Sequence, residues 1–461
     1  MPKMTERADS GGEAASRSRY ERAKAGHEAK VARISSQLHG RDGGSPLTLK
    51  KKAVSHQVPK PRDKRYSDDR LDISDLDQIL DIDVEGMTCT AEPGLTFVEL
   101  AKATLARGLV PLTVPEQKTI TIGGAVAGCS IESMSFMYGG FHDSCLEYEV
   151  ITAKGEVLAC TPDNENKLVF QMMNGTFGTL GIISKLKFRL VPAKKYVKVT
   201  NEKYRSVEEY KAAIWRHYKD RDYDFMDGLI YSLSECVLCM GSFVDEAPYA
   251  HNYDWTRIYY EMARRDREDY LKTIDYFFRY DAGTTHVDVK SPLGRLLLGR
   301  FLGSTNVLRV ANLFHGLIPP EKIPVIIDVF LPFSKLGDFL RWHEEETRYF
   351  PLWCVPYKAV RKYEWISEEY FAGMDEELLI DIAIYSMKTE DNERYYRRLE
   401  EKLMELGGLK TLISNNYYSE DEFWKVWNKR NYEEAKRVTD PGNVFRGLYE
   451  KTVRAARGLG S

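Results

Sequence analysis

The chain has 461 residues, of which 43% are hydrophobic and 29% are charged, and its formal net charge is −3. This length exceeds what one hydrophobic core usually serves, so we expect two packed domains. The nearly neutral charge gives no general attraction for nucleic acid and argues against that class of partner. The seven cysteines are an odd number, which favours reduced thiols in a cytoplasmic compartment.

Neither a membrane span nor a metal site is expected from the sequence. No apolar run approaches the roughly 20 residues of a membrane-spanning helix, and residues 1–30 lack the apolar core of a signal peptide. Cys236 and Cys239 form a single CxxC pair, and a zinc site would need a second one. We read "SECVLCMG" as a strand that places these two thiols on opposite faces, buried and inert.

The N-terminal segment is predicted to be disordered over residues 1 to about 17, because it is polar and rich in small residues. Residues 18–38 contain helix formers of both charges. Gly26 interrupts them, and an interior glycine weakens a helix. We therefore expect the helix to become stable only from His27.

Strands and short helices alternate between residues 46 and about 193. Residues 72–83 are expected to form a short helix that passes into a strand. Residues 96–108 show the apolar spacing of an amphipathic helix that ends at a glycine. Residues 147–161 read as a hairpin that turns at Lys154 and Gly155.

The middle of the chain is rich in aromatic and charged residues. We expect a long charged helix over residues 255–280, and a strand over 325–333 followed by a helix. In "YFPLWCVPY", alternation places Phe350, Leu352 and Cys354 on one face and Trp353, Val355 and Tyr357 on the other. Either face could line an apolar pocket, although such a strand is more often plain core.

The densest run of small residues is "TIGGAVAGCSIES" at residues 121–133. The spacing of its glycines does not match the dinucleotide-binding fingerprint, and no Gly-Lys-Ser/Thr of a Walker A loop is present. Glycines allow a backbone to approach a phosphate or a flat ring closely. The alternative is a helix that packs tightly on a sheet, and the run by itself does not decide between them.

The surroundings of this run carry a family resemblance. "VPEQKTITIGGAVAG" at 114–128, "GTLGIISKLKFRLVPAKKYVKV" at 178–199 and "DPGNVF" at 440–445 resemble, in this order, the FAD-binding domain of the vanillyl-alcohol oxidase/p-cresol methylhydroxylase flavoproteins. "HEAKV", "IESMSFMYG", "DGLIYSLSE" and "EFWKVW" are similar to the Δ24-sterol reductase group, including its bacterial relatives that reduce 10-methylene fatty acyl chains.

The resemblance implies an α+β fold with two domains: an FAD-binding domain of this type and an α+β cap, or substrate, domain. The expected boundaries are an N-terminal tail and helix over 1–45, the FAD-binding domain over 46–195, the cap domain over 196–428 and a C-terminal return to the FAD-binding domain over 429–461.

The resemblance also implies a set of FAD-binding residues. His56 is the one candidate for a covalent flavin bond in its loop, and we expect non-covalent FAD with NADPH as electron donor. The implied cofactor-binding residues are Lys52, Ser55, His56, Pro115, Thr121, Gly123, Gly124, Gly128, Ser130, Ile131, Glu132, Tyr138, Gly178, Thr179 and Ile182.

The implied activity is an FAD-dependent reduction of a C=C bond that no carbonyl activates. Protonation of such an alkene followed by hydride transfer from flavin N5 is the plausible route. The first expectation for the substrate is a 10-methylene fatty acyl chain in a phospholipid, reduced to 10-methyl, and a Δ24 sterol is the alternative. The N-terminal helix would then allow peripheral contact with the inner face of a membrane. An FAD-linked alcohol oxidase or dehydrogenase and a non-catalytic lipid-binding protein stay open.

Candidates for the proton donor lie in "DYFFRYD". Tyr276 or a desolvated Asp281 could give a proton, and Arg279 could position it or hold an anionic headgroup. A buried structural ion pair is an equally good interpretation of these residues.

Overall fold

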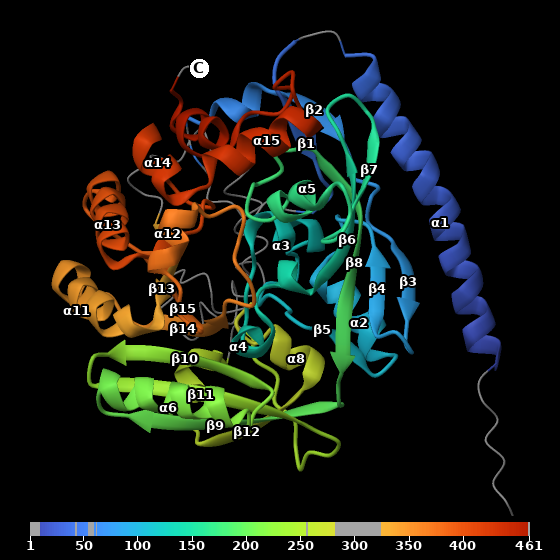
Figure 1. Cartoon of the computed structure of the whole chain (residues 1–461). Coiled ribbons are helices and arrows are strands. Elements are labelled where there is room, and N and C mark those ends of the chain that lie inside the picture. Colours follow the sequence, from blue (N-terminus) through green and yellow to red (C-terminus); the bar gives the residue numbers. More distant parts are fainter. Residues whose placement is uncertain are drawn as a thin grey trace, which may run out of the picture.

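The structure is a computed structural model of the chain. It describes residues 10–41, 44–53, 60, 62–254, 257–281 and 324–459. Two antiparallel sheets face each other across the molecule, as Figure 1 shows.

The first sheet is built from residues 79–192, in the order β3-β4-β8-β6-β7, with β5 paired to β8. Its long central strand is β8, with the pattern of alternate buried residues expected of a strand with one face in the core. The strands are β3 (Ile79–Asp83), β4 (Thr88–Ala91), β5 (Leu109–Pro111), β6 (Cys145–Ile151), β7 (Val157–Cys160) and β8 (Ile182–Pro192).

The second sheet has eight strands in the order β12-β9-β11-β10-β14-β15-β13-β16. These strands are β9 (Tyr196–Tyr204), β10 (Phe225–Ser232), β11 (Glu235–Val244), β12 (Glu268–Lys272), β13 (Val325–Pro332), β14 (Leu352–Lys358), β15 (Leu378–Met387) and β16 (Leu409–Lys410). A parallel pair, β1 (Leu47–Lys50) and β2 (Asp69–Asp72), stands apart from both sheets.

Most α-helices lie on the outer surfaces of the sheets, whereas α3 and α4 lie between them (Figure 1). The helices that come before β9 in the chain are α1 (Ser10–His39), α2 (Phe97–Leu105), α3 (Ile122–Gly128), α4 (Ser135–Tyr138) and α5 (Lys167–Met172). The others are α6 (Val207–Asp220), α7 (Tyr259–Ala263), α8 (Thr273–Phe277), α11 (Leu336–Thr347), α12 (Glu368–Gly373), α13 (Asn392–Leu406), α14 (Glu420–Val426) and α15 (Lys429–Thr439).

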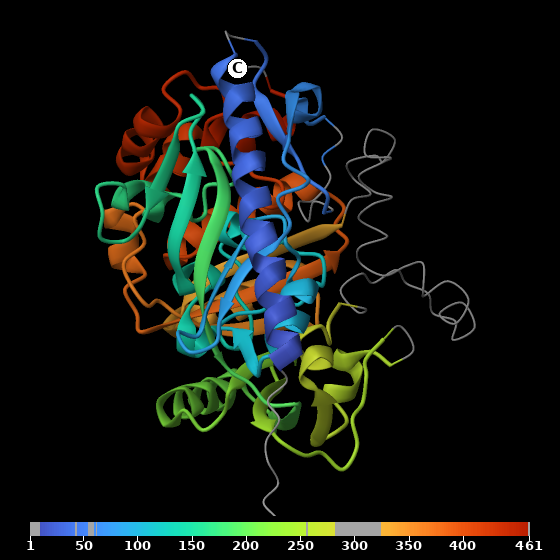
Figure 2. The ribbon, with the colours of Figure 1, turned by 90° about the vertical axis from the view of Figure 1, so that its right-hand side faces the viewer.

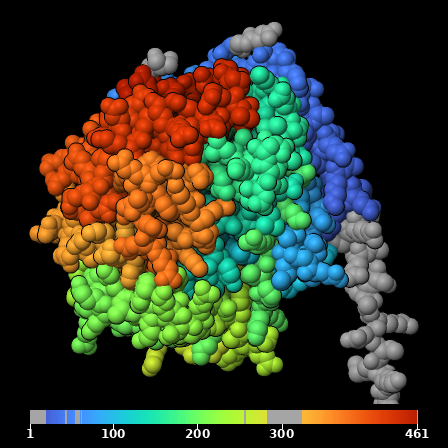
Figure 3. Space-filling view, viewed as in Figure 1, coloured from blue at the N-terminus to red at the C-terminus, as the bar shows by residue number. Residues whose placement is uncertain are grey.

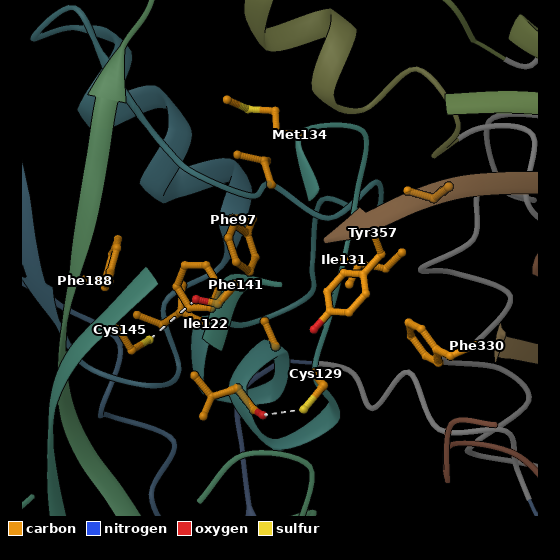
Figure 4. Packing of buried hydrophobic residues seen from close by; sticks show 14 of the residues in the cluster. Phe97, Ile122, Cys129, Ile131, Met134, Phe141, Cys145, Phe188, Phe330 and Tyr357 are labelled. Carbon is orange, nitrogen blue, oxygen red and sulfur yellow. Dashed lines mark hydrogen bonds between the residues drawn. The ribbon is translucent and has the colours of Figure 1, made fainter. Parts of the chain in front are cut away.

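The second sheet separates two apolar cores because its strands alternate. Ile327, Leu352 and Ile382 point to the core under α6, α11 and α13, whereas Phe330 and Tyr357 point to the core shared with the first sheet. In Figure 4, Tyr357 lies beside Ile131, from the segment after α3, and Phe330 lies beyond it. The face of the second sheet that carries Phe330 therefore meets the glycine run.

The C-terminal residues return to the first half of the chain. Leu47 of β1 forms a bridge with Phe445, and the ammonium of Lys436 donates to the carbonyl oxygens of Thr179 and Phe445. In the space-filling view this red segment lies directly against the teal and orange parts of the surface (Figure 3).

Helix α1 differs from the sequence prediction. It runs unbroken through Gly26 from Ser10, so residues 10–17 are helical rather than disordered, while residues 1–9 lie outside the described part. It lies across the first sheet (Figure 2), where Ile34 and Leu38 are buried. This tertiary packing outweighs the roughly 1 kcal/mol that an interior glycine costs.

Two other predicted elements are wrong in part. Residues 72–83 contain no helix, because the Asp72 carboxylate accepts from the backbone N–H of Ser74 and fixes a turn before β3. The long helix expected over 255–280 is replaced in its described part by α7, β12 and α8. The charged stretch in its middle pairs with β9 as an edge strand.

Several local predictions are confirmed. The amphipathic helix appears as α2, the hairpin as β6 and β7 with Gly155 at a φ of +80°, and the strand over 325–332 is followed by α11. Cys236 and Cys239 are buried on opposite faces of β11. In the part of the chain that the structure describes, no helix combines the length and apolarity that crossing a membrane requires.

Candidate active site

A cavity of about 770 Å³ lies where the glycine run meets the second sheet. Pockets for small ligands and cofactors usually measure roughly 300–1,000 Å³. One wall comes from β1, the segment 115–131 and the turn at 177–183. The opposite wall comes from β13, β14, β15 and Thr411.

The three glycines of the run have three different environments. A Cβ on Gly123 would lie 2.5 Å from the Cβ of Pro93, so this glycine permits close packing of α3. A Cβ on Gly124 would lie 3.1 Å from Oγ1 of Thr121, whose hydroxyl accepts from the Gly124 N–H. A Cβ on Gly128 would meet nothing within 4 Å, so this glycine leaves open space beside the cavity.

Most of the cofactor-binding residues expected from the sequence line this cavity. They are Lys52, Pro115, Thr121, Gly123, Gly124, Gly128, Ser130, Ile131, Gly178 and Ile182. Glu132, Tyr138 and Thr179 are not part of the lining, and Ser55 and His56 lie outside the described residues. Thr179 instead donates its hydroxyl to the carbonyl of Thr176.

A group of cations lines the cavity near β1. Burial lowers the pKa of Lys451 to about 7, and the charges of Arg65 and Lys51 act in the same direction. The side chain of Lys51 is exposed, and Arg65 pairs with Asp63. Cations that repel one another are stabilised by an anion, and a pyrophosphate would fit this donor set. Lys52 is exposed and pairs with Asp77 at 2.6 Å.

A group of acids lines the opposite side. Glu116 comes from the loop before α3, and Asp328 and Asp381 come from β13 and β15. Burial raises the pKa of Glu116 to about 8 and that of Asp328 to about 6. The hydroxyl of Tyr385 donates to Oδ1 of Asp328 at 2.6 Å. Among the described residues no group of three or more His, Cys, Asp or Glu is arranged to hold a metal ion.

These acids were not among the residues expected from the sequence, although a signal was present. Asp328 and Asp381 each interrupt an apolar strand, "VIIDVFLP" and "LLIDIAIYSM". A buried carboxyl is costly and calls for a specific reason. Trp353 also lines the cavity, so the aromatic strand β14 serves both as core and as a cavity wall.

Tyr276, Arg279 and Asp281 do not line the cavity. The Arg279 guanidinium is fully buried and pairs with Asp227 at 2.9 Å and Glu132 at 3.3 Å. Burial disfavours its charge, but Asp227 outweighs this and holds the pKa of Arg279 above its usual value. The structure thus contains the buried ion pair that the sequence left as an alternative. A catalytic role for the three residues stays a prediction.

Comparison with known proteins agrees with the cofactor segment. Residues 67–161 match the model of an FAD binding domain. The chain is 26% identical to Delta(24)-sterol reductase of Homo sapiens over 408 residues, which cover 83% of this chain and 77% of that protein. It is also 26% identical to Delta(24)-sterol reductase of Arabidopsis thaliana over 495 residues, which cover 95% of this chain and 86% of that protein. Cytokinin dehydrogenase 5 of Arabidopsis thaliana is 27% identical over 140 residues, which cover 30% of this chain and 26% of that protein.

The fold, the cavity and these matches define the class of protein: an FAD-dependent oxidoreductase with the α+β, two-domain FAD-binding fold expected from the sequence. Within this class the chain is similar to Delta(24)-sterol reductases along most of its length, which confirms the resemblance.

Proposed function

We propose that this protein reduces an isolated C=C bond of a lipid, with FAD as cofactor and NADPH as electron donor. The observation that carries the proposal is one cavity with cations on one side and buried acids on the other. Long similarity to proteins named Delta(24)-sterol reductase supports a sterol side chain as the first substrate to test. A 10-methylene fatty acyl chain is the second, because its alkene gives a tertiary carbocation in the same way.

The residues of this chain divide the task between them. Lys51, Arg65 and Lys451 would hold the pyrophosphate of FAD, and Gly128 leaves room for the cofactor beside the backbone. When bound and reduced, the flavin supplies a hydride. Phe330 and Trp353 would contact the alkene and keep water away from it, and the acids provide a proton.

An anaerobic absorbance titration tests the proposal. The FAD-loaded protein is first reduced with NADPH, and then a Δ24 sterol or a 10-methylene acyl phospholipid is added in detergent. We expect NADPH to bleach the flavin band and one of the lipids to restore it. Restoration by oxygen after reduction with an alcohol would favour an oxidase. A band that no donor bleaches would favour a non-catalytic lipid-binding protein.

A further inference from the structure

Asp328 and Asp381 are neighbours on the face of the second sheet that lines the cavity. In the register of β13 and β15, Phe330 is opposite Asp381, and Asp328 is opposite Ala383. Positions two residues apart share a face, so the two aspartates are diagonal cross-strand neighbours. Both line the cavity, together with Glu116 from the opposite wall.

The two aspartates differ in their hydrogen bonds. Oδ1 of Asp328 accepts from the hydroxyl of Tyr385. Asp381 is only 2% exposed, and its Oδ1 has no hydrogen-bond partner among the residues that the structure describes. A buried polar atom without a partner is rare and needs an explanation. A neutral carboxyl group that offers its O–H to a ligand in the cavity explains this one.

We propose that Asp381 is the acid that protonates the double bond, and that Asp328 and Tyr385 are positioning residues that keep it protonated. This inference rests on the proposed function. Burial raises the pKa of Asp381 well above its usual value, and the nearby Asp328 and Glu116 add to the shift. Tyr385 donates to Asp328, which favours the carboxylate of Asp328 and thereby leaves the proton on Asp381.

The reaction balances with one proton and one hydride. The O–H bond of Asp381 breaks, and the electron pair of the alkene forms a C–H bond at the less substituted carbon. The positive charge that remains on the more substituted carbon accepts the hydride that the reduced cofactor supplies, which forms the second C–H bond. Until the hydride arrives, the carboxylate of Asp381 stabilises the positive charge on the substrate carbon. The carboxylate then regains a proton from solvent.

The first test separates the two half-reactions in D381N. We expect this variant to bind FAD and to be reduced by NADPH as the wild type is, and to lose about 10²–10⁴-fold in the rate at which the lipid restores the flavin band. D381E, which keeps an acid, should recover part of that rate. D338N changes an exposed aspartate of α11 and is the matched control, with no change expected.

The second test needs no turnover. Infrared spectra of the oxidised, FAD-loaded protein at about pH 8, with ¹³C-labelled aspartate, should show the C=O band of a protonated aspartate carboxyl. This band should be absent in D381N. It should be present in E116Q, because only aspartate carries the label and Glu116 therefore does not contribute to the shifted band. The wild-type spectrum decides this point even if D381N does not fold.

Three results would overturn the inference in distinguishable ways. If the lipid restores the flavin band equally fast in D381N, Asp381 is not the donor although the proposed function stands. A wild-type spectrum without the band of a protonated aspartate would likewise show that Asp381 is not the donor, and it would leave the proposed function intact. If no lipid alkene restores the band in the wild type, the proposed function itself fails, and the role of Asp381 fails with it.

Discussion

The roles of two glycines in α3 depend on the atoms that surround each of them. Gly123 and Gly128 belong to the same short helix and look equivalent in the sequence. A side chain at Gly123 would collide with Pro93, whereas one at Gly128 would occupy open space at the cavity. The first glycine therefore serves packing, and the second serves the ligand.

This difference predicts opposite results for two alanine substitutions. Gly123→Ala should lower the free energy of unfolding by about 1–3 kcal/mol because the new methyl group overpacks against Pro93. Gly128→Ala should leave that free energy within about 0.5 kcal/mol and weaken FAD binding. Urea unfolding of the FAD-free proteins and a fluorescence titration with FAD measure the two effects. Equal FAD affinity of the wild type and Gly128→Ala would contradict the assignment of Gly128.

His27 fastens α1 to the first sheet through charge. Its Nδ1 and Nε2 each lie 2.9 Å from a carboxylate, that of Glu92 and that of Glu149. Burial alone would lower the pKa of His27, but hydrogen bonds to Glu149 and Glu92 raise it above its usual value. Burial alone would raise the pKa of Glu149, but its hydrogen bonds from His27, Lys185 and Ser184 lower it to about 2.

The sign of the pH effect follows from these shifts. A raised pKa means that the folded state binds the proton more tightly, so His27 stabilises the fold fully below about pH 6.5. That stability is lost as the pH rises through the folded pKa. His27→Gln should therefore flatten the pH dependence of the midpoint of urea unfolding above about pH 6. His39→Gln, at the exposed end of α1, is the control, and an unchanged slope in His27→Gln would refute the coupling.

At the scale of elements, a glycine inside α1 and a glycine just after α2 both lie in open space but differ in backbone conformation. Gly26 lies inside α1, and a Cβ there would meet nothing within 4 Å. Gly108 ends the turn after α2 with a φ of +71°, and its Cβ would also be free of contacts. Only the backbone conformation differs between the two sites.

Alanine at these two sites should shift stability in opposite directions. Gly26→Ala should stabilise the protein by about 0.5–1 kcal/mol, since alanine favours the helix. Gly108→Ala should destabilise it by about 1 kcal/mol or more, because the left-handed region disfavours a Cβ. Thermal unfolding of both variants is a sufficient measurement. A lower melting temperature for Gly26→Ala would show that α1 is not continuous through this position.

At the scale of the whole molecule, Arg279 joins the two halves of the chain. It pairs with Asp227 of β10 and with Glu132, which follows α3, and Trp353 of the cavity wall donates its indole N–H to Asp227 at 2.8 Å. Burial raises the pKa of Glu132 to about 7 in spite of the neighbouring Arg279 charge. The network therefore depends on the guanidinium, and Trp353 connects it to the cavity.

Removal of Arg279 should lower the free energy of unfolding rather than affect the lipid half-reaction directly. Arg279→Ala leaves two buried carboxyls without their cation and should cost about 3–5 kcal/mol of unfolding free energy. If Arg279 were instead a catalytic residue, the variant would keep its stability and lose the lipid half-reaction. Urea unfolding, together with the rate at which lipid restores the flavin band, separates the two roles. Arg264→Ala, which breaks an exposed pair with Glu235, is the control.

The sequence by itself determined the parts that depend on local pattern. The family resemblance of the glycine run and its neighbours pointed to the FAD-binding segment, and ten of the expected residues line the cavity. Alternation assigned the faces of β11 and β14 because a strand repeats every two residues whatever lies around it. The chain length predicted two domains, and the odd number of cysteines predicted free thiols, because both are properties of the chain as a whole.

Only the tertiary structure decided which charged residues meet. Glu116, Asp328 and Asp381 are far apart in the sequence. Asp328 and Asp381 meet because β13 pairs with β15, and Glu116 joins them from the loop before α3 on the opposite wall. Likewise, the sequence left open whether Arg279 positions a proton donor, holds an anionic headgroup or forms a structural ion pair. The structure pairs it with carboxylates from two distant segments. The pKa of a buried group depends on its neighbours in space, and periodicity along one strand does not contain that information.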